Sequence, residues 1–177
     1  TKEPGLTDPI RNLQITDSTF ENISSDTDEV AGILLAENVS VTVSGNEFRN
    51  ISGTDNTSGI QLERNVATVG PSATISGNEF DGVGTGVYVY ENTDGDNITA
   101  STNSFVNTSD VGVNNTGSGV VDATNSWWGD ASGPDEVGTG NGAFVSENVS
   151  FDPWYVDKGR TTLSNAEEPT TSSGGGG

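Results

Sequence analysis

The chain contains no cysteine, no histidine and no methionine. Without cysteine there is no disulfide framework and no thiol chemistry, and without cysteine or histidine there is no zinc site of the usual ligand types. The lack of histidine also excludes a Ser-His-Asp triad. The lack of cysteine does not exclude an extracellular location, because salt-adapted surface proteins can do without it.

Basic residues are scarce. Lys and Arg together number 6 against 26 Asp and Glu, so the formal net charge is −20. Nucleic acid and anionic membrane surfaces bind clustered Lys and Arg, so this charge balance argues against both as partners. Such a charge repels itself in dilute buffer and is screened to within about 3 Å in 1 M salt. The composition resembles that of proteins from extreme halophiles, especially haloarchaea; an acidic linker or an ordinary acidic surface protein is the alternative.

Apolar residues are also few. Hydrophobic residues make up 30% of the chain and aromatic residues 7%. No apolar run is long enough to span a membrane. A chain with this few apolar residues and this high a net charge lies near the compositional boundary of disordered proteins. A folded domain is therefore indicated only if the apolar residues follow a regular pattern along the sequence. The length of 177 residues suits one domain rather than two.

One seven-residue phrase recurs along the chain. It reads GILLAEN from Gly32, GIQLERN from Gly59, GVYVYEN from Gly86 and GAFVSEN from Gly142, with a degenerate copy, GVNNTGS, from Gly112. These glycines are spaced 27, 27, 26 and 30 residues apart. Apolar and variable residues alternate in the phrase and Asn closes the full copies, which predicts a short strand with one buried face, followed by a turn.

A second phrase precedes each copy of the first and is centred on an aromatic residue. An apolar residue lies five positions before the aromatic, and in three copies Asn lies two positions before it. The aromatics are Phe20, Phe48, Phe80 and Phe105; the apolar residues are Ile15, Val43, Ile75 and Ala100; the asparagines are Asn46, Asn78 and Asn103. The fifth copy is ambiguous, because Asn125 fits if Trp127 is the equivalent aromatic and Ala123 fits if Trp128 is.

Two short strands in each repeat of about 27 residues describe one coil of a β-solenoid, in which stacked coils share a continuous core. The sequence predicts an all-β parallel β-helix of about five to six coils. Like residues would then stack in ladders: Phe20, Phe48, Phe80 and Phe105 in one line, and inward-facing Asn38, Asn65, Asn92 and Asn148 at a corner. An antiparallel sandwich would not repeat position by position, and a left-handed hexapeptide helix needs a six-residue period that is absent.

Charged residues also fall into columns. Arg49 would lie between Glu21 and Asp81, and Arg64 would lie between Glu37 and Glu91. One interpretation is a pair of arginines that grips a substrate. The other is a set of exposed ion pairs, each contributing about 0–1 kcal/mol.

The repeats resemble those of right-handed parallel β-helix proteins, the pectate-lyase-like superfamily, which includes carbohydrate-binding and sugar-hydrolysing members. The run Asn125-Ser126-Trp127-Trp128-Gly129-Asp130, then Gly133-Pro134 and Phe151-Asp152-Pro153-Trp154, is similar to the closing motif of such repeats in archaeal and bacterial surface proteins. We expect Trp127, Trp128, Trp154 and Tyr155 to cap the last coil. The alternative is that Trp127 and Trp128 form an aromatic platform for a sugar ring.

The resemblance covers roughly residues 10–157. Residues 1–12 form an N-terminal lead-in without a dedicated cap, which leaves room for further coils upstream. Residues 13–157 form the β-helix domain. Residues 158–177, rich in Thr, Ser and Gly, read as a flexible tail or linker, native or engineered.

Eight N-x-[ST] sequons are present, roughly twice the number that the composition would give by chance. They begin at Asn22, Asn38, Asn50, Asn56, Asn97, Asn107, Asn114 and Asn148. This excess favours a glycosylated protein outside the cell or on its surface. Alternatively, turns rich in Asn and Thr create sequons without any such role.

Catalytic candidates are sparse. Glu47 and Glu79 would stack on adjacent coils as an acid/base couple, with Arg49 beside them. Asp94 and Asp96 resemble part of a calcium loop but lack a full ligand set, so no cofactor is expected and Ca²⁺ is the one candidate.

The sequence therefore favours a non-catalytic surface module, structural, adhesive or binding a polysaccharide or cell-surface glycan. A polysaccharide lyase or glycoside hydrolase of the superfamily is the first alternative. A periplasmic β-helix for maturation of a copper enzyme is the second, and the lack of His, Cys and Met speaks against direct copper handling by this segment.

Overall fold

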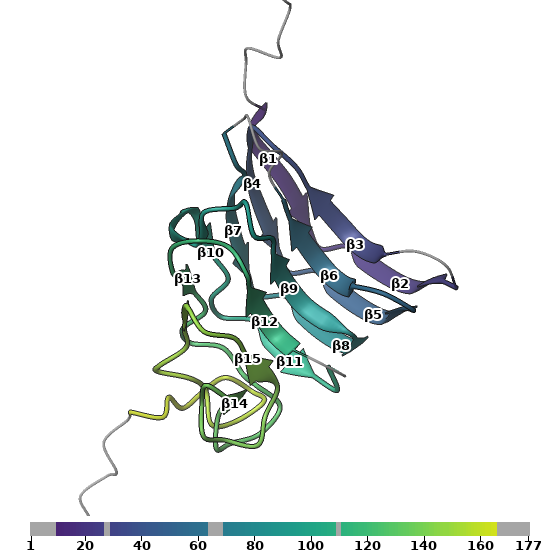
Figure 1. Cartoon of the computed structure of the whole chain (residues 1–177). Helices are drawn as coiled ribbons and strands as arrows, with labels where there is room; N and C mark the ends of the chain where they lie inside the picture. The colour runs from purple at the N-terminus through teal and green to yellow at the C-terminus, as the bar shows by residue number, and fades with distance from the viewer. Residues whose placement is uncertain (1–9, 27–28, 64–68, 109–110, 166–177) are drawn as a thin grey trace, which may run out of the picture.

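The computed structural model describes residues 10–26, 29–63, 69–108 and 111–165, which wind through three sheets (Figure 1). Sheet A holds β1 (Ile10–Thr16), β4 (Val39–Ser44), β7 (Ser72–Ser76), β10 (Ile98–Thr99), β13 (Val121–Asp122) and β16 (Val149–Ser150). Sheet B holds β2 (Thr19–Ser25), β5 (Glu47–Gly53), β8 (Glu79–Val83) and β11 (Ser104–Val106). Sheet C holds β3 (Val30–Leu35), β6 (Thr57–Leu62), β9 (Thr85–Val89), β12 (Val111–Asn115), β15 (Phe144–Val145) and β14 (Asp135–Glu136).

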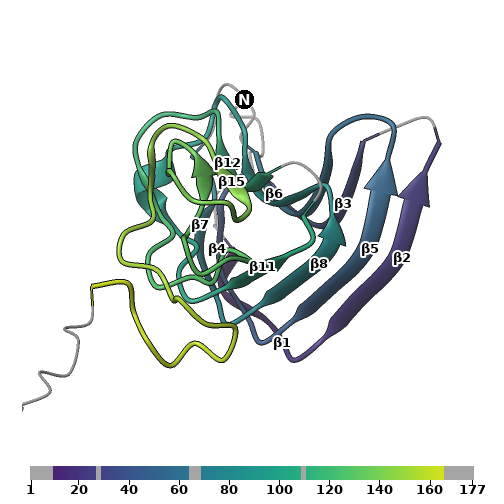
Figure 2. The same cartoon turned by 90° about the horizontal axis from the view of Figure 1, so that it is seen from below.

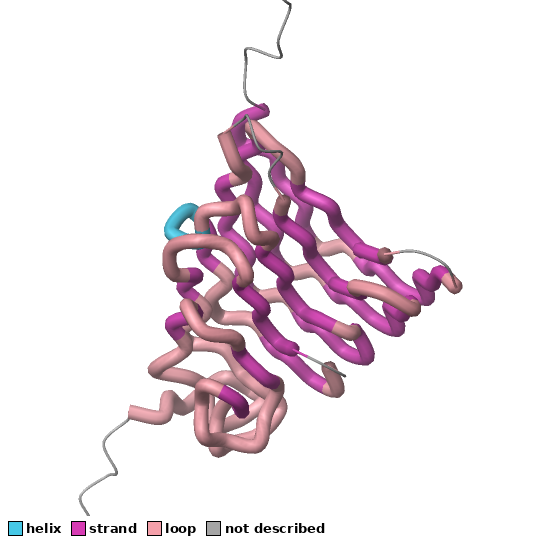
Figure 3. The backbone as a smooth tube through the Cα atoms, in the orientation of Figure 1, coloured by secondary structure: helices cyan, strands magenta, loops and turns pink. Residues whose placement is uncertain are grey.

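The chain visits sheets A, B and C in turn, and the named strands pair in parallel with the strand one coil away, except that the short β14 pairs with the next strand of the chain, β15. Figures 2 and 3 show these strands lying side by side, with one helical turn, Gly95–Asn97, outside the sheets. The predicted all-β parallel solenoid is confirmed, with about five coils. Among the described residues, no helix has the length and apolar character needed to cross a bilayer.

A continuous stack of aromatic rings lies on the inner face of sheet B. Phe20, Phe48, Phe80 and Phe105 follow one another with ring centroids 5.0, 4.8 and 5.2 Å apart and nearly parallel planes. Trp128 extends the stack at 4.8 Å from Phe105. Phe48, Phe80, Phe105 and Trp128 are fully buried, so the stack forms the centre of the core.

The glycines of the repeated phrase make room for these rings. A Cβ atom on Gly59 would lie 2.6 Å from Cδ1 of Phe80, and one on Gly86 would lie 2.6 Å from Cε1 of Phe105. Such contacts are shorter than van der Waals packing allows. Glycine therefore recurs every coil because sheet C must approach the aromatic stack closely.

A second interior column consists of buried amides at the corner between sheets A and B. The Oδ1 atoms of Asn78 and Asn103 accept the backbone N–H of Asn46 and Asn78 at 2.9 and 3.0 Å. The Nδ2 atoms of Asn46, Asn78 and Asn103 donate to the carbonyls of Ile15, Val43 and Ile75 on the preceding coil. Every amide thus satisfies backbone groups that the turn would otherwise leave buried and unpaired.

The inward-facing ladder expected at the corner of the repeated phrase is not present in the described residues. It was to consist of Asn38, Asn65, Asn92 and Asn148. Asn148 is exposed, Asn38 and Asn92 are only half-buried, and Asn65 lies outside the described residues. Asn38 and Asn148 adopt φ values of 57° and 58°. In these two copies Asn closes the phrase because it tolerates the left-handed backbone of the corner, whereas the buried amides come from the other corner.

The fifth coil resolves the ambiguity between the two tryptophans. Trp127 pairs with Ser104, which places Trp128 beneath Phe105 and Ala123 in the sheet A column. After Trp128 the chain leaves the coil path at Gly129, whose φ is 90°. Trp154 then packs over Gly133, and its Nε1 donates to the carbonyl of Ala131 at 3.2 Å. An aromatic cluster thus closes the C-terminal end.

Both ends of the expected domain differ from the sequence interpretation. β1 begins at Ile10, inside the expected lead-in. Part of the expected tail is hydrogen-bonded: Leu163 pairs with Tyr155, and Nη1 of Arg160 donates to the carbonyl of Thr102 at 2.6 Å. Residues 166–177 lie outside the described residues.

Candidate functional site

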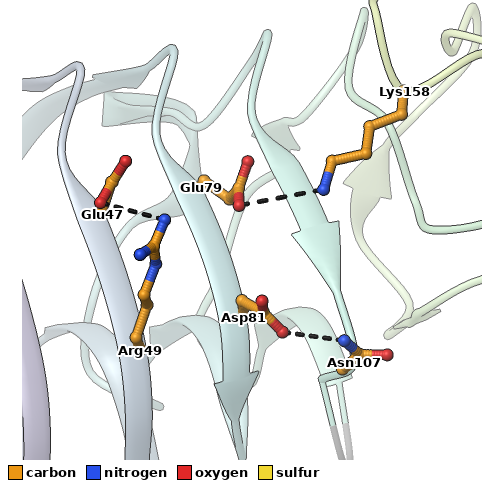
Figure 4. A network of polar contacts seen from close by, with 6 residues as sticks. All are labelled: Glu47, Arg49, Glu79, Asp81, Asn107 and Lys158. Carbon is orange, nitrogen blue, oxygen red and sulfur yellow. Dashed lines mark hydrogen bonds and ion pairs between the residues drawn. The ribbon is translucent and has the colours of Figure 1, made fainter.

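The outer face of sheet B carries most of the charged candidates (Figure 4). Arg49 is in register with Glu21 on one side and Asp81 on the other, so the predicted charge column exists. The ion pair, however, joins Nη2 of Arg49 to Oε2 of Glu47, two residues earlier on the same strand, at 3.1 Å. Asp81 instead accepts a hydrogen bond of 2.8 Å from Nδ2 of Asn107.

Glu47 and Glu79 lie in register on β5 and β8 but face different cations. Glu47 pairs with Arg49, and Oε1 of Glu79 lies 4.0 Å from Nζ of Lys158. The side chains of Glu47 and Arg49 are 46% and 42% exposed, so water screens their attraction strongly. Each carboxylate therefore pairs with its own cation and does not contact the other carboxylate, which is the geometry of surface ion pairs and not of an acid/base couple.

Asp94 and Asp96, the calcium candidates, accept backbone N–H groups, one in their own turn and one on the following coil. Oδ1 of Asp94 accepts the N–H of Asp96 at 3.2 Å and caps the helical turn, while Oδ1 of Asp96 accepts the N–H of Val120 at 2.7 Å. Within the described ranges, no group of three or more acidic side chains is placed to hold a metal ion. The carboxylates here order the crossing from β9 to β10.

The remaining binding candidates do not form a site on the described surface. Trp128 is fully buried and Trp127 is 9% exposed, so the sugar-platform interpretation of this pair is wrong. The ring of Trp128 belongs to the core and closes it at the last full coil, whereas Trp127 lies outside the core cluster. Arg64 lies outside the described residues.

The outer face of sheet C presents a different set of side chains. Leu34, Gln61, Tyr88 and Asn114 occupy one register position on β3, β6, β9 and β12 and form a column along the helix axis. Leu34 is 55% exposed, although it lies in a strand. Gln61 is buried, and the hydroxyl of Ser58 donates to its Oε1 at 3.4 Å.

Two tyrosines stand in the middle of this face. The rings of Tyr88 and Tyr90 meet edge to face, with centroids 5.2 Å apart and planes at 69°. The charge of Glu29, then Tyr88 and burial, raise the pKa of Tyr90 above its ordinary value, and Glu91 and Glu63 act in the same direction. The phenol of Tyr90 therefore stays protonated and can donate a hydrogen bond at neutral pH.

A hollow of about 500 Å³ continues this face toward the C-terminal end. Val111, Val137 and Phe144 line it together with Glu136, Val145, Ser146 and Glu147. We use the name sheet C stripe for Leu34, Tyr88, Tyr90, Asn114 and Phe144. It combines apolar and aromatic surface with amide and hydroxyl groups, and Glu136 and Glu147 add carboxylates in the adjoining hollow; this mixture is found in small-ligand sites.

The candidate residues proposed from the sequence did not include Tyr88 and Tyr90. The signal lies in the repeated phrase itself, whose third and fifth positions face outward. In GVYVYEN both positions are aromatic, whereas GILLAEN has Leu34 and Ala36 there and GIQLERN has Gln61 and Glu63. Two aromatic residues at neighbouring outward positions form a half-buried aromatic cluster on the outer face, which makes this face the candidate binding surface.

Comparison with known proteins identifies the fold family. The family described as right handed beta helix region matches residues 5–127. No curated protein matches the chain, and no solved structure does.

Proposed function

The chain belongs to the right-handed β-helix family, and from that membership and its surface we propose that it is an extracellular, non-catalytic carbohydrate-binding module of a salt-adapted organism. The ligand is a neutral polysaccharide or cell-surface glycan, and it lies along the sheet C stripe. The observation that carries the proposal is the edge-to-face pair of Tyr88 and Tyr90 at the centre of an outward strand face.

The chemistry of the stripe suits sugars. The faces of sugar rings are apolar and pack on aromatic side chains, while their hydroxyls need amide, hydroxyl and carboxylate partners. Tyr88 and Tyr90 supply both kinds of contact, and Asn114 follows Tyr88 on the next coil. Since coils repeat at about 4.8 Å, a polymer that itself repeats along the axis meets an equivalent position on each coil.

Charge and sequons support the proposed location. A net charge of −20 favours a medium of high ionic strength, where self-repulsion is screened. It also makes a neutral glycan a better ligand than a polyanionic one. Asn22, Asn50 and Asn148 begin sequons and are exposed, so these three can be reached by a glycan-transferring enzyme.

The test is affinity electrophoresis and depletion assays with a panel of neutral polysaccharides in molar KCl, comparing the native chain with Tyr88→Ala and Tyr90→Ala. Val120→Ala is the matched control, because it shortens an apolar side chain that is 48% exposed outside the stripe. We expect retention by at least one polysaccharide, lost in either tyrosine variant and kept in the control. Retention that is absent throughout, or unchanged in both tyrosine variants, would contradict the proposal.

The same assay decides between binding and catalysis. Release of reducing ends or unsaturated products would establish a lyase or hydrolase instead. The arrangement that argues for binding is the separate pairing of Glu47 with Arg49 and Glu79 with Lys158, since an acid/base couple requires its two carboxyl groups to act on one substrate bond.

A further inference from the structure

A column of residues with left-handed backbone runs along sheet B on successive coils. They share a φ between 51° and 67°, and each directly follows the register position that Arg49 occupies: Asn22, Asn50, Gly82 and Asn107. The three asparagines are exposed. We call these asparagines the sheet B column, and each of them begins an N-x-[ST] sequon.

The backbone accounts for the asparagines but not for the serines that accompany them. Asn and Gly adopt a left-handed conformation at the least cost, so either can fill the column, and neither requires a hydroxyl two residues later. In the copies that hold Asn, the residue at that distance is a serine, namely Ser24, Ser52 and Ser109. In the copy that holds Gly82, it is Gly84. The hydroxyl is present with the amide and absent without it, as expected of an acceptor motif.

Accessibility separates these sequons from others in the chain. A transferase must reach both the amide and the hydroxyl of the motif, because both define it. The sequons on β2 and β5 expose their Asn and their Ser alike. In the sequon that begins at Asn56, the Asn is exposed but Ser58 is only 1% exposed. Asn38 and Asn114 are themselves half-buried. The sheet B column is therefore better placed for modification than these three sequons.

The hydrogen bonds of the column leave room for a sugar. A side-chain amide has two N–H donors. Nδ2 of Asn50 donates to Oδ1 of Asn22 at 3.4 Å, and Nδ2 of Asn107 donates to Oδ1 of Asp81 at 2.8 Å (Figure 4). Each of these bonds uses one N–H, so the other can be replaced without loss of the bond.

We propose that the sheet B column is a site of N-linked glycosylation, at which oligosaccharides are joined to Nδ2 of Asn22, Asn50 and Asn107. The donor is a lipid-linked sugar phosphate. A bond forms between Nδ2 and the anomeric carbon, the bond from that carbon to the phosphate oxygen breaks with its electron pair leaving on the phosphate, and Nδ2 releases one proton. The inference rests on the extracellular location in the proposed function. It does not rest on carbohydrate binding, because the column lies on sheet B and the tyrosines on sheet C.

The test is secretion of the full chain from a halophilic archaeal host, with a C-terminal tag that carries a sequon of its own. The host is chosen because it glycosylates the tag, so an empty column reflects the protein and not the host. Mass spectrometry of the intact protein and of its peptides gives the occupancy of each sequon. We expect glycans at Asn22, Asn50 and Asn107, and much lower occupancy at Asn56.

Two sets of variants change the motif and keep the turn. Ser52→Ala should remove the glycan from Asn50 and Ser52→Thr should retain it, while Asn50 itself stays in place. Gly82→Asn combined with Gly84→Ser should create an additional occupied site. Asn suits the φ of 67° at Gly82, and the new Cβ would meet Oδ1 of Asn50, the end of a flexible side chain, at 3.1 Å. Gly82→Asn without the serine should add no glycan.

Empty sequons throughout the column, beside an occupied tag, would overturn the proposal. Occupancy at Asn56 equal to that at Asn50, or a double variant of Gly82 and Gly84 that gains no glycan, would overturn it too. The result is separate from the polysaccharide assay, because Ser52→Ala should leave polysaccharide retention unchanged. A chain that is glycosylated along the column but retained by no polysaccharide would contradict only the binding function.

Discussion

The indole of Trp128 stacks on the ring of Phe105, with centroids 4.8 Å apart and planes 20° from parallel. The ring thus ends a column begun by Phe20, and it does so at the coil that has no full successor. Its position explains why a bulky residue replaces phenylalanine there: a larger ring covers more of the core that a further coil would otherwise bury.

Replacing Trp128 with Ala should lower the free energy of unfolding by about 3–5 kcal/mol, because it removes a fully buried aromatic side chain and leaves a cavity at the end of the stack. Chemical denaturation in molar salt measures the change. Val120→Ala, at an exposed position, should change stability by less than about 0.5 kcal/mol. Equal effects of the two variants would show that the ring does not close the core.

Replacing Asn78 with Ala should cost about 2–4 kcal/mol, because it leaves the N–H of Asn46 and the carbonyl of Val43 buried without their partners. Asn148→Ala tests the other corner. Its side chain is exposed at φ 58°, so only the backbone preference is lost, about 1 kcal/mol. If Asn148→Ala proved the more damaging of the two in denaturant titrations, the assignment of the buried amide column would be wrong.

Gly59→Ala should destabilise the protein by about 1–3 kcal/mol, because its Cβ would lie 2.6 Å from Phe80 and 2.9 Å from the carbonyl of Gly86. Gly77→Ala separates steric overlap from backbone strain: Gly77 has φ 68°, but the nearest atom to the new Cβ beyond its chain neighbours is the N of Gly45, at an ordinary contact distance of 3.8 Å. Near-ultraviolet circular dichroism should therefore change in Gly59→Ala, where the aromatic stack shifts, and remain native in Gly77→Ala. A native aromatic spectrum in both would contradict the close approach.

Stability should rise with ionic strength, because screening relieves the repulsion within a chain of net charge −20. Thermal unfolding followed by circular dichroism, from very dilute buffer to molar KCl, measures the effect. Full β-structure with an unchanged Tm at very low ionic strength would count against adaptation to salt.

Glu47→Gln and Glu79→Gln should each change the free energy of unfolding by less than about 1 kcal/mol, because the ion pairs they remove are solvent-exposed. Polysaccharide retention should be unaffected, since both side chains lie on sheet B and the tyrosines on sheet C. A polysaccharide-degrading activity that either substitution abolished would make these carboxylates catalytic after all.

The sequence was sufficient to predict the solenoid because repetition is visible in one dimension. Residues that recur every coil, such as Phe48 and Phe80, must stack if the coils do, and their rings lie 4.8 Å apart. The same reasoning placed Arg49 between Glu21 and Asp81, as the strand register has it.

The repeat does not predict the direction of long side chains or the burial of residues at the corners. Period alone cannot say that Arg49 turns toward Glu47, because both acids of the column and the one on its own strand are within reach of a long side chain. The repeat period also does not distinguish an Asn whose amide is buried from an Asn that occupies a left-handed turn. For this reason the sequence predicts a buried Asn148, whereas Asn148 is exposed and Asn78 is buried. The repeat does not predict the outward tyrosines, because the third and fifth positions of the phrase vary from coil to coil.

The direction of the amide column has a consequence for biosynthesis. Each Asn side chain serves backbone groups of the coil before it, as Asn78 does for Asn46 and Val43. During synthesis, the corner backbone groups of a coil therefore gain their hydrogen-bond partners only when the next coil has been made. Folding of each coil should be completed one coil later than its synthesis. The winding that ends in Ser126 and the tryptophans is completed by the segment that folds back over it, because the N–H of Asn125 donates to the carbonyl of Pro153 and the carbonyl of Ser126 accepts the N–H of Tyr155.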